Sequence, residues 1–277
     1  MSELRFIKMQ GLGNDFVIID RRSGRLSLGP EQIRRIADRR FGIGCDQLLS
    51  IEPSPAADAF MRVYNADGSE SGACGNGTRC VARLLMDETG GSEVRIETEA
   101  GVLRVRAGLR GYTVDMGRPR FGWDEIPLAR PMDTLALELA LGPLERPVAV
   151  NMGNPHAVFF VDDAEAVPLE ELGPRLEHDP LFPERANIGV AEVRDERTIR
   201  LRVWERGAGL TTACGSGACA ALVAAARRGL AGRSADLLLD GGRLHVVWTD
   251  ADRVLMTGPA ALSFSGEIAP ELLAVTG

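Results

Sequence analysis

The chain has 277 residues, which suits one large domain or two of ordinary size. Apolar residues make up 45% and charged residues 26%, values typical of a soluble globular protein with a hydrophobic core. The net charge of −7 argues against a general nucleic-acid-binding surface, so we expect no nucleic-acid partner. No apolar run reaches the roughly 18 residues that a membrane span needs, and we expect no membrane association.

The cysteine content and the N-terminal sequence indicate a reducing compartment. Five cysteines, an odd number, do not suggest a disulfide framework. The first residues, MSELRFIKMQ, lack the basic and then apolar arrangement of a secretory signal. We therefore expect a cytoplasmic protein.

In chain order, the first half predicts short strands and one clear helix. Strands rich in Val, Ile and aromatic residues, and broken by Gly, are expected at 16–20, 59–64, 94–98, 101–107 and 112–116. After the second of these strands, the glycine-bearing loop ADGSESGA leads into CGNGTRCVARLLMD, which we interpret as a helix. The helix would then begin at Cys74.

Segment 118–143 separates this half from the next. It is rich in Pro and is interpreted as partly linker, although LALELAL within it could add a strand. The second half then repeats the earlier order, with RLRVWE as a strand, RGAGLTTA as a loop and CGSGACAALVAAARRG as a helix. Gly229, which follows two arginines, is typical of a residue that ends a helix.

The two halves are related by a constant offset of 140 positions. Because the offset persists through five separated blocks, we infer an internal duplication. The aligned pairs are Cys74 with Cys214, Gly75 with Gly215, Gly77 with Gly217, RVY (62–64) with RVW (202–204), Gly13-Asn14 with Gly153-Asn154, Gln47 with Asn187, VDM (114–116) with VLM (254–256), and Pro119 with Pro259.

This duplication predicts an α+β fold with two matching lobes, each made of short strands around one buried helix. The expected N-terminal lobe spans 1–119 and carries Cys74, and the expected C-terminal lobe spans 120–262 and carries Cys214. The remaining segment, 263–277, is apolar enough that we expect it to pack on the first lobe.

The two aligned cysteines are the strongest functional signal. A thiol at a helix N-terminus faces unpaired N–H groups and the positive end of the helix dipole, which lower its pKa. The same N–H groups can bind a carboxylate. Two such units facing each other across a cleft between the lobes would place one thiol on each side of a bound anion. That arrangement suits inversion of a stereocentre next to a carboxylate, because one thiolate removes a proton while the opposite thiol returns one.

Other interpretations stay open at this level. The remaining cysteines, Cys45, Cys80 and Cys219, have no cysteine at the repeat offset and are expected in the core. The spacings C-x5-C and C-x4-C fit no common zinc pattern, so no metal is expected. A cofactor is not expected either, because no full G-x-G-x-x-G pattern is present. The alternatives are a two-thiol racemase of another amino acid, such as proline or hydroxyproline, and a non-catalytic thiol protein in redox or metal chemistry.

Several blocks resemble the diaminopimelate epimerase family. They occur in the family's order over nearly the whole chain and are highly specific as a set. The blocks are MQGLGNDFVIID, FGIGCDQLL, YNADGSESGACGNGTRC, NMGNPHAVFF, RANIGVAEV and WERGAGLTTACGSGACA.

The resemblance implies a PLP-independent isomerase that interconverts LL- and meso-2,6-diaminopimelate in the biosynthesis of the amino acid lysine, without a cofactor. It implies two pseudo-symmetric lobes, each a β-barrel-like sheet around a central helix, with the active site between them. It also implies a homodimer.

The family's functional positions are all matched. Cys74 and Cys214 match the two catalytic acid/base residues, and His156 and Glu205 match residues that tune a cysteine pKa. The positions that match substrate contacts are Asn14, Gln47, Asn65, Gly75, Asn76, Asn154, Asn187, Glu205, Arg206, Gly215 and Ser216.

The repeat is broken at some of these positions, as a substrate with two different ends requires. Asn65 aligns with Glu205, and Ala66 aligns with Arg206. A guanidinium suits bidentate capture of a carboxylate, and a glutamate can hold an ammonium. We therefore expect recognition of the substrate to depend on the second half more than on the first.

Overall fold

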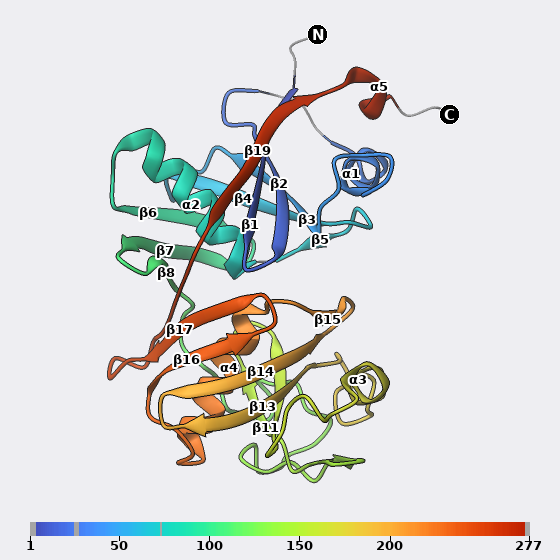
Figure 1. Ribbon diagram of the computed structural model, residues 1–277, viewed down its shortest axis with the longest axis vertical. Coiled ribbons are helices and arrows are strands. Elements are labelled where there is room, and N and C mark those ends of the chain that lie inside the picture. Colours follow the sequence, from blue (N-terminus) through green and yellow to red (C-terminus); the bar gives the residue numbers. More distant parts are fainter. Residues whose placement is uncertain (1–3, 25–27, 73, 275–277) are drawn as a thin grey trace. The chain divides into compact units, whose positions relative to one another are not determined.

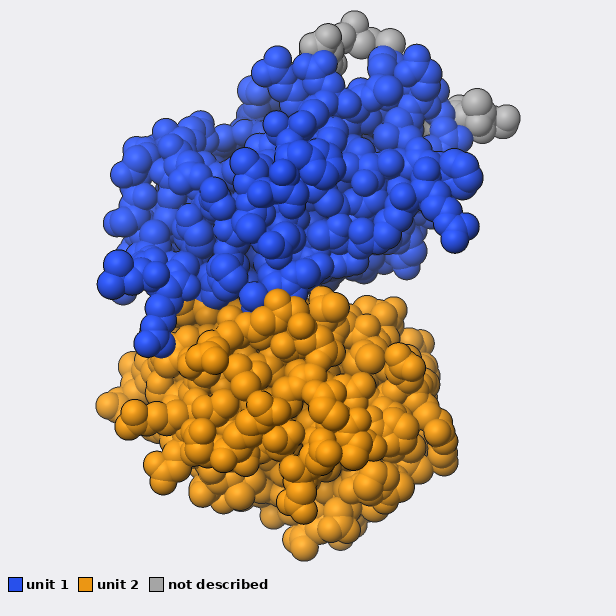
Figure 2. Space-filling model, in the orientation of Figure 1, with its two compact units in different colours: residues 1–114, 258–277 blue, residues 115–257 orange. Residues whose placement is uncertain are grey.

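The computed structural model describes residues 4–24, 28–72 and 74–274, so residues 275–277 of the expected tail lie outside it. The chain divides into two compact units, one formed by residues 1–114 and 258–277 and the other by residues 115–257 (Figure 2). The expected boundaries at 119 and 262 differ from these because of backbone pairing. Met116 N–H donates to Val254 O and Val254 N–H donates to Gly117 O, which ties 116–117 to the second unit.

The first unit is a mixed sheet with helices. Its neighbouring strands run in the order β19, β1, β2, β3, β4, β6, β7, β8, with β5 added on β4. Only the β2–β3 and β4–β6 pairs are parallel. The strands are β1 (Leu4–Gly11), β2 (Asn14–Asp20), β3 (Gln47–Glu52), β4 (Ala59–Asn65), β5 (Glu70–Ser71), β6 (Glu93–Thr98), β7 (Gly101–Gly108), β8 (Gly111–Asp115) and β19 (Ala261–Ile268), and the helices are α1 (Pro30–Ala37), α2 (Gly75–Thr89) and α5 (Pro270–Leu273).

The second unit repeats this plan. Its neighbouring strands run in the order β11, β12, β13, β14, β16, β17, β18, with β15 added on β14, and the parallel pairs are β12–β13 and β14–β16. A separate hairpin joins β9 and β10. The strands are β9 (Ala140–Leu141), β10 (Leu144–Glu145), β11 (Val148–Asn151), β12 (Pro155–Phe160), β13 (Asn187–Asp195), β14 (Thr198–Glu205), β15 (Gly209–Thr211), β16 (Ser234–Leu239), β17 (Gly242–Trp248) and β18 (Val254–Gly258), and the helices are α3 (Leu169–Glu177) and α4 (Gly215–Arg227).

Strand register follows the sequence repeat closely. Phe16 of β2 lies opposite Gln47 of β3, and His156 of β12 lies opposite Asn187 of β13. Both members of the second pair are 140 positions after those of the first. The register is the same across β2, β3, β4 and β5 as across β12, β13, β14 and β15, which is the structural form of an internal duplication.

Each sheet curves around one helix (Figure 1). Helix α4 is buried on all sides from Gly217 to Ala225, because a helix of Ala, Leu, Val and Cys has no polar face to expose to water. It contacts β11, β12 and β13 as well as β16 and β17. Helix α2 likewise contacts β1 and β2 near one end of its sheet and β6 and β7 near the other. The predicted α+β fold with a central helix in each lobe is confirmed.

The strands expected in the first half are all present within one or two residues, but other elements differ from the prediction. The segment LALELAL contributes only the two residues of β9 to a strand. Each unit also contains a second helix, α1 or α3, that the sequence pattern did not predict. No helix in the described part of the chain is both long and apolar enough to cross a membrane.

Candidate active site

Cys74 caps the N-terminus of α2. Its backbone is extended, and its sulfur accepts a hydrogen bond from Gly77 N–H at 3.3 Å. The Cys74 carbonyl starts the helix by accepting from Thr78 N–H at 2.8 Å. A side chain that satisfies a first-turn N–H stabilises the helix start, so the thiol is held by the helix that it begins.

Cys214 caps α4 with the same geometry. Its sulfur accepts from Gly217 N–H at 3.3 Å, and the backbone is again extended. A side chain on the third residue after each cysteine would be crowded. A Cβ on Gly217 would lie 3.1 Å from the Cys214 sulfur, and a Cβ on Gly77 would lie 2.8 Å from a methyl group of Leu49. These glycines let the thiol, the helix and the sheet pack in one place.

The sequence-based expectation that the helix lowers the thiol pKa is wrong for Cys214. Burial raises its pKa well above the ordinary value, and the carboxylate of Glu205 raises it further. The hydrogen bonds from Ser216 and Gly217 oppose this but are smaller effects. Desolvation penalises the thiolate more than the helix N-terminus stabilises it, because the residue is only 3% exposed. Cys214 is therefore a thiol at neutral pH.

A buried polar chain leads from β12 to Cys214. His156 Nε2 lies 2.9 Å from Asn154 Oδ1 and 3.1 Å from the Ser216 hydroxyl, which lies 3.6 Å from the Cys214 sulfur. Because an amide oxygen only accepts, Nε2 carries the hydrogen. Burial, and to a smaller extent Arg206, lower the pKa of His156 to about 3. The imidazole is thus neutral and can position Ser216 without adding charge beside the thiol.

Around Cys74 the polar chain is shorter. The Cys74 sulfur lies 3.9 Å from Asn14 Oδ1, which also accepts from Asn76 Nδ2 at 3.2 Å. Asn14 Nδ2 donates to Asp46 Oδ2 at 2.9 Å. Because the carboxylate of Asp46 can only accept, it fixes the amide of Asn14 with its oxygen toward Cys74 and Asn76.

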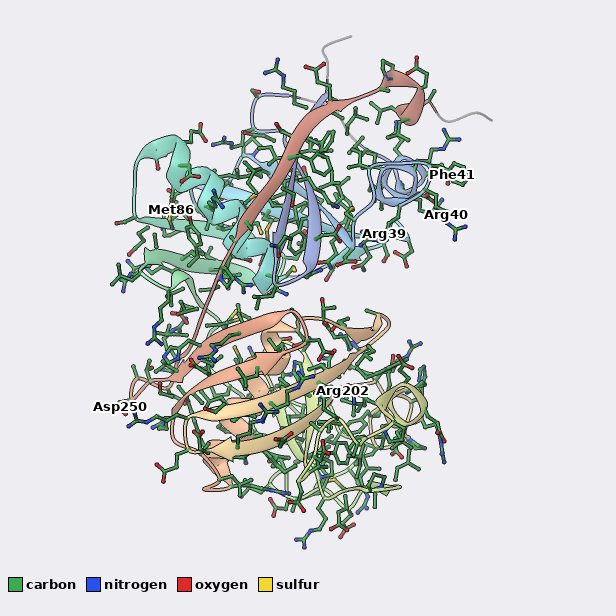
Figure 3. The ribbon with its side chains drawn as sticks, in the orientation of Figure 1. Arg39, Arg40, Phe41, Met86, Arg202 and Asp250 are labelled. Atoms are coloured by element: carbon green, nitrogen blue, oxygen red, sulfur yellow. The ribbon has the colours of Figure 1, made fainter. Side chains whose placement is uncertain are left out.

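Asp46 belongs to an ionic cluster that has no counterpart in the sequence of the second half. Arg39, which follows α1 and is labelled in Figure 3, donates at 2.6 Å to both Asp15 and Asp46. Asp15 also accepts from Lys8 at 2.5 Å. Although burial opposes it, hydrogen bonding and attraction from Arg39 and Lys8 hold the pKa of Asp15 well below its usual range. Asp15 therefore stays ionised between the two cations.

The other expected contact residues of the first unit form a pair. Gln47 Nε2 donates to Asn65 Oδ1 at 3.0 Å, across the β3–β4 ladder, and Asn65 Nδ2 donates to Ser69 at 3.0 Å. Both amides are thereby oriented before any ligand binds.

In the second unit the corresponding positions are Asn187 and Glu205. The amide of Asn187 is 2% exposed, donates to Pro155 O at 2.9 Å and accepts from Arg206 N–H at 3.0 Å. Glu205 accepts from the Thr211 hydroxyl at 2.5 Å. Asn187 therefore supports the backbone at Arg206, in addition to any contact that it makes with a ligand.

The sequence analysis did not identify Asp46, which binds Asn14, or Thr211, which binds Glu205. A signal for Asp46 was available, because it lies between Cys45 and Gln47 in a recognised block and aligns with Ala186 at the repeat offset. Thr211 also lies in a recognised block, but its contact with Glu205 depends on the pairing of β14 with β15, which the sequence does not show.

The other three cysteines are buried in the core, as predicted. Burial raises the pKa of Cys45 to about 11 and that of Cys80 to about 12. Cys219 lies inside α4 with no exposed surface. Thiols of this kind pack as small apolar groups and react slowly.

The family model for diaminopimelate epimerase matches residues 6–122 and 148–263, which are most of both halves. The chain belongs to the diaminopimelate epimerase family. Its relatives in this family include the diaminopimelate epimerases of Acidiphilium cryptum and Rhodospirillum centenum, each 59% identical over 272 residues. These matches cover 97% of this chain and 98% and 94% of the two relatives.

Solved structures support the fold assignment. A phenazine biosynthesis protein of the PhzF family from Bacillus anthracis has a TM-score of 0.68 with this chain. The match covers 97% of this chain and all of that one at 19% identity, a level that shows a shared fold alone. The diaminopimelate epimerase family thus shares its two-unit architecture with proteins of different sequence.

Proposed function

We propose that this enzyme interconverts LL- and meso-2,6-diaminopimelate without a cofactor, using Cys74 and Cys214 as the two acid/base groups. The observation that carries the proposal is the identical placement of two thiols, each capping the central helix of one unit, in a chain that is 59% identical to diaminopimelate epimerases over nearly its full length. Inversion of an α-carbon next to a carboxylate needs a base on one face of the carbon and an acid on the other. A duplicated chain supplies such a pair.

The reaction is proposed to begin with Cys214 as the thiol. Its pKa is raised, so it holds a proton at neutral pH and can donate that proton to the α-carbon. Cys74 is then the group that removes the α-proton from the other face. The bond between the α-carbon and its hydrogen breaks, its electron pair delocalises into the carboxylate, and a new carbon–hydrogen bond forms from the Cys214 side. In the reverse direction the two roles exchange.

Backbone N–H groups at the two helix N-termini are proposed to bind the reacting carboxylate. Gly75-Asn76 and Gly215-Ser216 are the first residues of α2 and α4, where N–H groups lack intrahelical acceptors. Negative charge that grows on the carboxylate during proton abstraction is stabilised there.

The rest of the substrate is proposed to bind through amide and charged side chains. Glu205 would hold an ammonium and Arg206 a carboxylate of the end that is not epimerised. The proposed amide contacts are Asn14, Gln47, Asn65, Asn76, Asn154 and Asn187. His156 supports Cys214 through Ser216.

The finer expectations on context belong to the same proposal. We place the enzyme in the cytoplasm as a homodimer, where meso-diaminopimelate serves the biosynthesis of lysine. The acidic composition and the odd number of cysteines are consistent with that compartment. Light scattering of the purified protein measures the assembly directly.

The test is an exchange experiment in deuterated water. Reduced enzyme incubated with LL-diaminopimelate is expected to yield the meso isomer with deuterium at one α-carbon, followed by NMR. Proline and trans-4-hydroxyproline are incubated in parallel, because a two-thiol racemase of those substrates is the alternative. Exchange with either of them but not with diaminopimelate would replace the proposed substrate, and no α-exchange with any of the three would favour a non-catalytic thiol protein.

A further inference from the structure

The second unit contains a buried carboxylate that the proposed mechanism does not use. Glu177, the last residue of α3, is only 3% exposed. Its Oε2 accepts from Trp204 Nε1 at 2.8 Å, and its Oε1 accepts from Gly207 N–H at 3.0 Å. Burying a carboxylate is costly unless hydrogen bonds compensate, so a buried glutamate at this position needs an explanation.

The two donors lie on either side of Glu205 and Arg206. Trp204 precedes the pair at the end of β14, and Gly207 follows it in the turn that Ala208 N–H closes by donating to Glu205 O at 3.1 Å. The carboxylate therefore holds both ends of the short segment that carries the two charged side chains.

The first unit has no buried carboxylate at the position aligned with Glu177. Ala37, at the end of α1, aligns with Glu177, and the turn after Asn65 is held locally. Asp67 there accepts from Ser69 N–H at 2.9 Å and from the Ser69 hydroxyl at 2.6 Å. Among the described residues, a buried carboxylate at this place occurs only in the second unit, whose turn carries a glutamate and an arginine.

An ion pair with Arg185 is a weaker explanation of Glu177. Its guanidinium lies 3.7 Å from the carboxylate, and its side chain is 53% exposed. A pair of that length on an exposed side chain stabilises a fold little. The two hydrogen bonds to the segment around Arg206 have ordinary lengths, 2.8 and 3.0 Å, and one of them comes from a backbone N–H.

We infer that Glu177 is a positioning residue that fixes the turn bearing Glu205 and Arg206, and thereby sets the affinity for diaminopimelate. This inference rests on the proposed function of that turn. Glu177 acts through the backbone and does not touch the substrate.

The decisive variants are Glu177→Gln, Trp204→Phe and the two combined. A glutamine at 177 has one acceptor oxygen and one donor NH₂ group. Its oxygen can accept from only one of Trp204 Nε1–H and Gly207 N–H, and its NH₂ group then faces the other donor. Trp204→Phe removes the indole N–H and leaves the bond from Gly207. In the double variant the amide oxygen of Gln accepts from Gly207, and its NH₂ group meets no opposing donor.

We expect the KM for diaminopimelate to rise roughly tenfold in Glu177→Gln, the effect of one lost hydrogen bond to a charged group, with a smaller change in kcat. Trp204→Phe should raise KM less than Glu177→Gln does, because the bond from Gly207 N–H remains, and the double variant should recover most of the affinity lost in Glu177→Gln. A double variant as defective as Glu177→Gln would overturn the inference, because the lost charge opposite Arg185 would then be the cause.

Hydrogen exchange of the Gly207 amide separates this inference from the proposed function. Exchange should be faster in Glu177→Gln than in the parent and should slow again in the double variant, whichever substrate the enzyme accepts. If the parent enzyme does not epimerise diaminopimelate, the proposed function fails, while the exchange pattern still decides whether Glu177 holds the turn. Glu177→Ala removes both acceptors, so unchanged Gly207 exchange in that variant would refute the positioning role even in a fully active enzyme.

Discussion

The two units place a thiol in the same geometry but surround it with different chemistry. In both, the sulfur caps a central helix and accepts from an N–H group at 3.3 Å. Beyond the cap, Cys74 lies near an amide, Asn14, which an ionic cluster orients. Cys214 lies near a buried neutral imidazole and a carboxylate, Glu205.

The surroundings of the two thiols differ because the residues at aligned positions differ. The ionic cluster of Lys8, Asp15, Arg39 and Asp46 aligns with Val148, Pro155, Asp179 and Ala186. In the opposite direction, His156 aligns with Phe16 and Glu205 with Asn65. The caps have stayed alike because the proposed reaction treats both faces of one carbon equally. The surroundings differ because the substrate has one reacting end and one distant end.

The largest effect in this comparison is expected from the thiols themselves. Cys74→Ala and Cys214→Ala should each lower the rate of epimerisation by about 10³-fold, because each variant removes one of two acid/base groups. The conversion of LL- to meso-diaminopimelate, followed by NMR, measures the rate.

Each catalytic cysteine has a matched control on its own helix. Cys80 lies in α2 and Cys219 in α4, and both are buried away from solvent. Changing either to alanine should leave kcat within about threefold of the parent. The small cavity should lower the free energy of unfolding by about 1 kcal/mol, measured by thermal unfolding. A loss of activity in Cys80→Ala equal to that in Cys214→Ala would remove the distinction between capping and core thiols.

Glu205 is the residue that most distinguishes the second thiol from the first, and Glu205→Gln tests it. The carboxylate raises the pKa of Cys214, so removing its charge should lower that pKa toward the ordinary value while burial continues to raise it. Alkylation of Cys214 by iodoacetamide, read by mass spectrometry across a pH series, should therefore begin at lower pH in the variant. Activity should fall roughly tenfold or more, because the proposed bond to the substrate ammonium is also lost.

The control is Glu171→Gln, which removes one exposed carboxylate from α3 of the same unit. It should leave the alkylation profile of Cys214 unchanged. A profile that moves to higher pH in Glu205→Gln would contradict the assigned direction and would mean that the carboxylate stabilises the thiolate through another group.

The sequence could predict the central helices and most strands of the first half, because these have strong local patterns. Helix α1 was not predicted, since PEQIRRIA is only eight residues long and buries just Ile33, Ile36 and Ala37. Helix α3 was missed because Pro174 lies inside it, and a proline normally ends a helical pattern.

The candidate site shows a similar limit. The residue types followed from the duplication and the family resemblance, but the direction of the Cys214 pKa did not. That direction depends on burial and on Glu205, which β14 brings beside the cap. A helix N-terminus is visible in a sequence, whereas the desolvation that outweighs it comes from residues packed on it from elsewhere in the chain.

The smallest effect is expected from the cluster that distinguishes the first thiol. Asp46→Ala removes the acceptor that fixes the amide of Asn14, and alanine already occurs at the aligned position of the other unit, Ala186, which precedes β13 as Asp46 precedes β3. Asn14 would then keep its hydrogen bond from Asn76 but lose the one that it donates to Asp46, so substrate binding would have to order it further. We expect KM for diaminopimelate to rise roughly threefold to tenfold, the effect of immobilising one side chain, with little change in kcat.

Glu31→Ala is the matched control, because Glu31 is an exposed carboxylate of the same unit that pairs with Arg34 and Arg35. Glu31→Ala removes the same charge without changing a contact of Asn14. An equal rise in KM in both variants would therefore indicate an effect of the protein's overall electrostatic field and not of the Asn14 amide. If KM stays unchanged in Asp46→Ala alone, Asn76 suffices to hold Asn14. The ionic cluster would then stabilise the loop between α1 and β3, and the two thiols would differ chiefly through Glu205 and His156.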